Sequence, residues 1–212
     1  MSILKLENIC FSYEKTPVLE NVSYEFEKGY IYSIIGKSGA GKTTLLSILS
    51  GLAKPTSGTI YYDDKNIKKV DKYRFRSKYV GVVFQAYNLL TKFTALENVM
   101  LSMDISKKKI ANKKEHAYEL LEKVGLSREE ANRRVLKLSG GQQQRVAIAR
   151  ALSYEPDIIL ADEPTGNLDG ETQKEIMNIL RELTKAGKCV ILVTHSPEVA
   201  KMSDYVYELK KS

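Results

Sequence analysis

A glycine-rich segment at 36–43 constrains the fold of this 212-residue chain more than any other feature. Its spacing is G-x-x-x-x-G-K-T, and it lies between an apolar run at 31–35 and a helical pattern at 44–49. The run at 31–35 lacks strict alternation, which is typical of a strand buried on both faces. A buried strand, a glycine-rich turn and a helix, in this order, predict a phosphate-binding loop in an α/β fold.

The residue types in this segment suit a chain of phosphate groups. Glycines let the backbone turn so that successive N–H groups face the phosphates, and the following helix adds the positive end of its dipole. The Lys42 ammonium is expected to reach the β- and γ-phosphates. Because Mg²⁺ prefers oxygen ligands, the Thr43 hydroxyl is a predicted metal ligand.

The complete strand, loop and helix context favours ATP with Mg²⁺ as the ligand over a glycine-rich turn that binds no nucleotide. A phosphate-loop kinase acting on a small molecule is an alternative that explains residues 36–43 by themselves. The predicted nucleotide contacts here are Gly36, Lys37, Ser38, Gly39, Ala40, Gly41, Lys42, Thr43 and Thr44.

Two acidic residues follow a second strand-like run, at 157–161. A carboxylate at the end of a buried strand can hold Mg²⁺ beside the phosphates, so Asp162 is a predicted metal ligand. Glu163 lies one residue further, where it can polarise a water for in-line attack on the γ-phosphate. Two adjacent acids alone are weak evidence for this chemistry.

The residues at 138–152 predict a helix that begins with a polar turn and is otherwise apolar on most faces. Ser139 and Gln142 have the spacing of a capping box, in which the two side chains satisfy free backbone N–H groups. Taken alone, Ser139 is therefore interpreted as a helix cap.

Together, the phosphate loop, the sequence Leu-Ser-Gly-Gly-Gln at 138–142 and the pair Asp162-Glu163 make the whole chain resemble the ATP-binding subunits of ABC transporters. In that family the 138–142 type of segment closes over the nucleotide held by the partner subunit's phosphate loop. The resemblance therefore implies a homodimer with contacts in trans. The implied contact residues are Ser139, Gly140, Gly141 and Gln142.

The resemblance also implies roles for four single residues. Tyr13 matches the aromatic residue that stacks on adenine, although one of 13 tyrosines can equally belong to a core. Gln85 matches the glutamine that contacts Mg²⁺ and moves the helical lobe. Asp169 matches an aspartate at the subunit interface, and His195 matches the switch histidine. The implied catalytic residues are Lys42, Glu163 and His195.

Shorter motifs resemble the branch of the family that contains macrolide exporters and lipoprotein-release ATPases. They imply a separate transmembrane permease that exports or extracts a peptide, an antibiotic or a lipoprotein, or that signals across the membrane. The docking residues predicted for it are Tyr87, Leu89 and Leu90. The matching motifs are Phe84-Gln85, Asn88-Leu89-Leu90, Thr94, Glu97-Asn98-Val99, Gln142-Gln143-Gln144-Arg145 and Pro164-Thr165-Gly166-Asn167-Leu168-Asp169.

The predicted fold class is α/β, a phosphate-loop ATPase core with a mixed or parallel sheet. Buried runs at 31–35, 157–161 and 189–194 predict parallel strands covered by helices. Apolar residues at 3–9 and 18–26 predict an antiparallel β edge at the N-terminus.

Helical patterns dominate from about 86 to 152. The chain is therefore interpreted as one ATPase domain, 1–212, in which a helical lobe at about 86–152 is inserted. The core lobe is expected at about 1–85 and 153–212.

No apolar run approaches the roughly 20 residues that span a bilayer, and residues 1–6 lack the apolar segment of a secretory signal. A cytoplasmic location, peripheral on the inner face of the membrane, is expected. The net charge of +7 suggests the alternative of a soluble ABC ATPase that acts on DNA or the ribosome. The sequence shows neither a heptad array nor a repeat that would indicate coiled-coil arms or a second ATPase domain, so no nucleic-acid partner is expected.

The lysine run at 107–109, 113 and 114 is interpreted as a solvated helical face, with nucleic acid or anionic lipid as the alternative partner. His116, in a segment rich in Lys and Glu, is also expected to be solvated. Cys10 and Cys189 are expected to be buried small apolar residues rather than a disulfide or a metal site.

Overall fold

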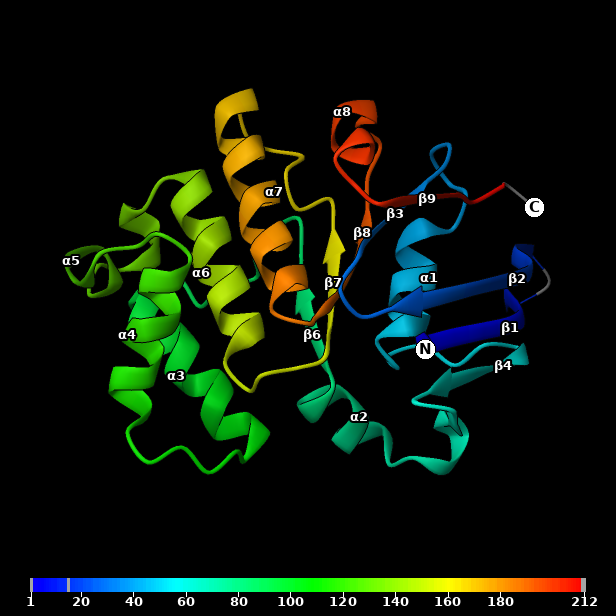
Figure 1. The fold of residues 1–212 in the computed structure, drawn as a ribbon, viewed down its shortest axis with the longest axis horizontal. Helices are drawn as coiled ribbons and strands as arrows, with labels where there is room; N and C mark the ends of the chain where they lie inside the picture. The colour runs from blue at the N-terminus through cyan, green and yellow to red at the C-terminus, as the bar shows by residue number, and fades with distance from the viewer. Residues whose placement is uncertain (1, 15, 211–212) are drawn as a thin grey trace.

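A five-stranded parallel sheet forms the centre of the fold (Figure 1). The computed structural model describes residues 2–14 and 16–210, and every structural statement refers to this part of the chain. The strand order is β6-β7-β8-β3-β9, and all neighbouring pairs are parallel, as the sequence predicted. The strands are β3 (Ile31–Ile35), β6 (Val80–Val83), β7 (Ile158–Asp162), β8 (Cys189–Val193) and β9 (Tyr205–Glu208).

A second, antiparallel sheet is built from the N-terminal part of the chain, in the order β2-β1-β4-β5. This confirms the predicted antiparallel edge, which is a separate sheet. Leu6 pairs with Tyr24 on one side and with Ile60 on the other, so β1 lies in the middle. Its strands are β1 (Ser2–Tyr13), β2 (Thr16–Glu27), β4 (Ser57–Tyr62) and β5 (Lys65–Asn66).

Alternate residues of the parallel strands belong to two buried clusters, one on each face of the sheet. In β7, Ile159 and Ala161 face the helices α3, α4, α6 and α7, whereas Ile158 and Leu160 face α1 and the antiparallel sheet. Covering both faces explains strands that are apolar without alternation. The helices are α1 (Lys42–Leu49), α2 (Lys72–Lys78), α3 (Ala95–Ser106), α4 (Lys113–Lys123), α5 (Arg128–Ala131), α6 (Gly140–Leu152), α7 (Gly170–Lys185) and α8 (Pro197–Lys201), with short 3₁₀ turns η1 (Ile67–Lys69) and η2 (Val135–Lys137).

Residues 86–94 are irregular, whereas the sequence indicated helix from about residue 86. The first helix after β6 is α3, which begins at Ala95, directly after a capping box formed by Thr94 and Glu97. Before it, Tyr87 and Asn88 have φ angles of 58° and 49°. Consecutive left-handed residues are incompatible with a right-handed helix, which explains the late start.

The interpretation of the lysine run as a helical face is wrong for residues 107–109. Helix α3 ends before Lys107, which has a φ of 56°, and residues 107–112 form a loop to α4. Lys108 forms an ion pair with Glu155. At least one positive charge of the lysine run is therefore paired with a carboxylate of the same chain.

Two further expectations need correction. His116 is not simply solvated, because only 24% of its side chain is exposed and its Nδ1 atom lies 3.5 Å from Glu119. Cys189 is buried, as predicted, but Cys10 is half-buried, and its Sγ atom accepts the Asn21 N–H group at 3.3 Å. Neither cysteine forms a disulfide within the described residues.

Candidate functional site

The predicted catalytic and metal-binding residues, except His195, line one pocket at the carboxyl end of the parallel sheet, and His195 contacts this pocket through Glu163. The loop after β3, Gln85 after β6, and the ends of β7 and β8 all contribute to it. Ligands of open α/β folds bind at this edge of the sheet. The lining residues are Val18, Ser38, Gly39, Gly41, Lys42, Thr43, Thr44, Gln85, Asp162, Glu163 and Val193.

Two glycines of the 36–43 loop lie so close to neighbouring atoms that neither position has room for a side chain. Gly41, the N-cap of α1, has a φ of 89°, and a Cβ atom there would lie 2.8 Å from side-chain atoms of Val18 and Leu19. A Cβ atom on Gly36 would lie 2.6 Å from the carbonyl oxygen of Leu209. No side chain caps α1, so the backbone N–H groups and the positive end of its helix dipole remain directed at the 36–43 loop.

The Lys42 ammonium lies within this loop. Its Nζ atom donates to the carbonyl oxygens of Gly36 at 2.8 Å and of Lys37 at 3.2 Å. These bonds hold a full positive charge among the backbone groups expected to surround phosphate.

Thr43 and Asp162, two of the three residues predicted to bind Mg²⁺, interact with each other. An interaction with the Thr43 hydroxyl stabilises the charged form of the Asp162 carboxylate. Burial raises the pKa of Asp162 above its usual value; the interaction with Thr43 and the charge of Lys42 oppose this shift, and the charge of Glu163 adds to it.

Glu163 and His195 meet where β7 and β8 end. The Nδ1 atom of His195 lies 2.8 Å from Oε1 of Glu163. The Glu163 side chain is 12% exposed, whereas that of His195 is 68% exposed. Glu163 has a φ of 46°, which is rare for a residue with a Cβ atom and costs on the order of 1–3 kcal/mol. Such strain is concentrated at functional sites.

Gln85 lies beside the loop that follows Glu163. Its side-chain Nε2 atom is 3.4 Å from the position that a Cβ atom on Gly166 would take. The residue is exposed and lines the same pocket as Asp162 and Glu163.

The 139–142 segment is built as the capping box predicted from the sequence. Ser139 Oγ accepts the Gln142 N–H group at 3.2 Å, and Gln142 Oε1 accepts the Ser139 N–H group at 2.8 Å. A Cβ atom on Gly141 would lie 2.6 Å from Cγ2 of Thr172. The segment does not line this pocket of its own chain within the described residues.

Tyr13 and Asp169 also lie outside that pocket. The Tyr13 ring is 61% exposed and packs edge-on against Phe11, with centroids 4.9 Å apart, so it is not a core residue. Asp169 caps α7 by accepting the Thr172 N–H group at 2.9 Å, and this bond lowers the pKa of its carboxyl group.

Sequence reasoning missed three residues that shape the site. Val18, from β2, lines the pocket, and nothing in its pattern indicates this. Gln144 Nε2 donates at 2.7 Å to the Pro164 carbonyl, next to Glu163. Arg150 Nη2 donates at 2.9 Å to the Tyr87 carbonyl, in the loop after Gln85. For Gln144 and Arg150, the available signal was a polar side chain within the apolar part of the helix predicted at 138–152.

Known proteins are similar to this chain in sequence and in fold. Residues 19–166 match the family described as "ABC transporter". The "Uncharacterized ABC transporter ATP-binding protein YclH" of Bacillus subtilis (strain 168) is 46% identical over 214 residues, which cover 100% of this chain and 95% of YclH. The "Macrolide export ATP-binding/permease protein MacB" of Campylobacter jejuni (strain 81-176) is 42% identical over 97% of this chain and 32% of MacB.

The solved structures include a close match in fold. The dimeric post-hydrolysis structure of the ATP-binding cassette MJ0796, bound to ADP and Pi, has a TM-score of 0.89 and 38% sequence identity. The match covers 99% of this chain and 96% of that one.

Proposed function

Because this chain belongs to the ABC transporter family of ATP-binding proteins, we propose that it powers a separate membrane permease that exports or extracts a peptide, an antibiotic or a lipoprotein. The chain is an ATPase, and its relatives favour a transporter subunit over an ATPase acting on DNA or the ribosome. The MacB name, which joins ATP-binding and permease functions, supports the export type. The observation that carries the proposal is that Lys42, Thr43, Asp162 and Glu163 line one pocket, in which Glu163 is held by His195.

The oxygen atoms of the pocket fit a magnesium ion. Thr43 offers a hydroxyl and Asp162 a carboxylate, and the two residues line the same pocket and interact with each other. Thr43, Asp162 and Gln85 would hold the ion, with phosphate oxygens completing the set. When bound, Mg²⁺ neutralises charge on the phosphates.

Hydrolysis requires a water molecule to lose a proton while it attacks the γ-phosphate. Glu163 accepts this proton in the proposed mechanism, because its carboxylate lies in the pocket and His195 fixes the orientation of Oε1. Lys42 binds the phosphates and stabilises the charge that develops on them.

A second copy of the chain completes the nucleotide site in this proposal. Ser139, Gly140, Gly141 and Gln142 lie outside their own pocket, at the start of a 13-residue helix. This segment of one copy closes on the nucleotide held by the 36–43 loop of the other. Asp169 lies at the same interface, and Tyr13 stacks on the adenine. The dimeric MJ0796 structure supports the arrangement.

A groove between α2, α3 and the end of α6 is the proposed docking site for the permease. Its two halves share Arg76, Ser102 and Tyr154. Arg150 also lines the groove, and its bond to the Tyr87 carbonyl connects the groove with the loop that follows Gln85. A permease segment seated there would therefore act on the nucleotide pocket through Gln85.

Two exposed apolar side chains line this groove and are available for contact with a permease. Leu52 is 61% exposed and Ile105 57% exposed, and both lie on its lining. Of the three docking residues predicted from the sequence, Leu90 is 45% exposed, whereas Tyr87 and Leu89 pack against the buried helical cluster. The docking surface is thus centred on α2 and α3, with Leu90 as the predicted residue best placed to contribute.

The proposal also includes the division of the chain into two lobes and its location at the membrane. We assign the core lobe to about 1–85 and 153–212 and the helical lobe to about 86–152, including the irregular segment before α3. None of the described helices is long and apolar enough to cross a membrane. Docking to a permease places the chain on the cytoplasmic, inner face of the membrane.

Copurification tests the proposed function. An affinity-tagged chain, extracted from its native membranes in mild detergent, should retain an integral membrane protein. Ile105→Asp should release that protein because a charge would enter the groove, whereas Leu136→Asp should not, since Leu136 is 70% exposed on η2, outside the groove. Recovery of the chain without any integral membrane protein would contradict the proposal.

A further inference from the structure

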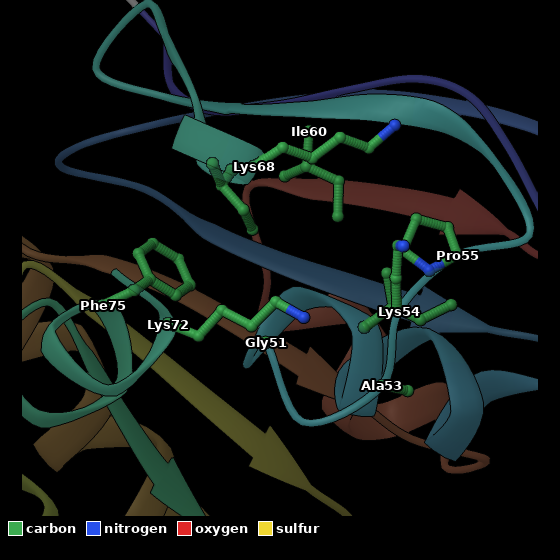
Figure 2. A pocket seen from close by; sticks show the side chains of 10 residues that line it. Gly51, Ala53, Lys54, Pro55, Ile60, Lys68, Lys72 and Phe75 are labelled. Carbon is green, nitrogen blue, oxygen red and sulfur yellow. The ribbon is translucent and has the colours of Figure 1, made fainter. Parts of the chain in front are cut away.

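A small apolar pocket ringed by lysines shares no lining residue with the nucleotide pocket or the groove. It is formed where the end of α1, the following loop, β4, η1 and α2 meet. Ile60 is 4% exposed and Phe75 1% exposed, and both line it. Figure 2 shows the side chains of Lys54, Lys68 and Lys72 around the pocket, each from a different segment of the chain.

The charge of the surrounding segment is strongly one-sided. Residues 54–78 contain eight Lys and Arg residues against three Asp residues. Lys54, Lys68 and Lys72 are exposed, and none of them forms an ion pair with any carboxylate of the described residues. The Lys68 ammonium donates only at 3.3 Å to the Gly58 carbonyl. Three cations at the rim of an apolar pocket thus remain for an external partner.

We propose that this pocket binds an acidic peptide segment of another protein, which inserts one aliphatic side chain and pairs its flanking carboxylates with Lys54, Lys68 and Lys72. The cavity is small, with about 50 Å³ open to the centres of water molecules, which suits a single side chain. Its lining is almost wholly apolar, so burial of an aliphatic anchor is favourable there.

The pocket floor favours a peptide over the other polyanions that lysines attract. A nucleic acid offers no aliphatic anchor, and the Phe75 ring is too deeply buried to stack on a base. A phospholipid in a bilayer would present its headgroup to the lysines while its acyl chains stay in the membrane, and the apolar cavity would be left unfilled. A peptide with one aliphatic side chain between acidic residues can fill the cavity and pair with the lysines at its rim.

Arg76 and Gly51 hold one side of the pocket in place. The Arg76 Nη1 atom donates to the Gly51 carbonyl at 3.0 Å, which ties α2 to the loop after α1. A Cβ atom on Gly51, whose φ is 73°, would lie 3.3 Å from the Phe75 ring. The pocket is therefore preformed, which reduces the entropic cost of binding.

Fluorescence anisotropy with a labelled peptide, Gly-Asp-Glu-Leu-Glu-Asp-Gly, tests the proposal on the full chain. Binding should be saturable. Replacing the peptide's Leu by Ser should weaken it about tenfold, because the anchor is lost. The triple variant Lys54→Gln/Lys68→Gln/Lys72→Gln should also weaken it about tenfold.

A matched variant controls for net charge. Lys65→Gln/Lys69→Gln/Lys78→Gln removes the same charge from exposed positions nearby, none of which lines the pocket, and should change the affinity by less than about twofold. Both variants should hydrolyse ATP at the wild-type rate, which verifies folding. Equal losses in the two variants, or equal binding of the Leu and Ser peptides, would overturn the proposal. So would tighter, pocket-dependent binding of phosphatidylglycerol vesicles or a single-stranded oligonucleotide.

Discussion

The Oε1 atom of Glu163 lies 2.8 Å from the Nδ1 atom of His195, and this contact joins the ends of two neighbouring parallel strands. The Glu163 N–H group also donates to the Val193 carbonyl at 3.0 Å, which fixes the backbone where it turns out of the sheet. Strand pairing, a left-handed backbone and a histidine contact together hold one carboxylate beside the phosphate loop. Changes in either residue should therefore act on the same catalytic step.

Lys42→Ala should weaken MgATP binding at least about tenfold, because it removes a charged hydrogen-bond donor from the phosphate loop. Isothermal calorimetry measures this directly. Lys37→Ala is the matched control, since the carbonyl of Lys37, rather than its exposed side chain, takes part in the loop. Unchanged ATP affinity in Lys42→Ala would refute the role of the ammonium.

Gly41→Ala should impair nucleotide binding more than Gly39→Ala. Both glycines have positive φ angles, 89° and 76°, so both variants strain the backbone. Only the Gly41 substitution places a methyl group 2.8 Å from Val18 and Leu19, whereas the space around Gly39 is open. Thermal unfolding and MgATP affinity should both show this order, and equal effects would mean that the close approach is unimportant.

Tyr13→Ala should raise the dissociation constants of ATP and ADP by the same factor, about 5- to 100-fold, because a stacked ring does not sense the γ-phosphate. Tyr73→Ala removes a ring of similar exposure on α2 and should leave both constants unchanged. A loss confined to ATP would exclude adenine stacking.

Asp162→Asn should raise the thermal stability of the nucleotide-free protein at neutral pH. Burial raises the pKa of the Asp162 carboxyl group in the folded state, so its stabilising contribution is complete below the unfolded-state pKa and is lost as the pH rises through the folded-state value. The advantage of the variant should therefore shrink as the pH falls towards 4. A difference in melting temperature that does not change with pH would contradict this.

The motifs predicted most of the site because phosphate binding requires a fixed local order of strand, loop and helix. The buried strand at 31–35, the loop and the acids after β7 come together because parallel strands end at the same edge of the sheet. The capping box of Ser139 and Gln142 was equally local and is confirmed.

Features that depend on tertiary contacts were not predictable. The irregular segment around Tyr87 and Asn88 is held by Arg150, which is more than 60 residues away in the sequence. The loop at 107–109 replaces a helix because Lys107 takes a left-handed conformation, which its side chain does not indicate. Val18 reaches the nucleotide pocket only because β2 passes close to Gly41.

Glu163→Gln should bind MgATP normally but hydrolyse it about 10²- to 10⁴-fold more slowly, because the amide cannot accept the proton of the attacking water. Uncleaved ATP then remains between the 36–43 loop of one subunit and the Ser139 segment of the other. The closed dimer should persist for the same reason.

Light scattering on Glu163→Gln tests the central claim most directly. The variant should shift from monomer to dimer with MgATP but not with ADP, and adding Ser139→Arg should abolish the shift by blocking the start of α6. Hydrolysis at the wild-type rate would remove Glu163 as the base. A protein that stays monomeric at high concentration with MgATP, and also fails to pair when its permease is present, would contradict the composite site formed by two subunits.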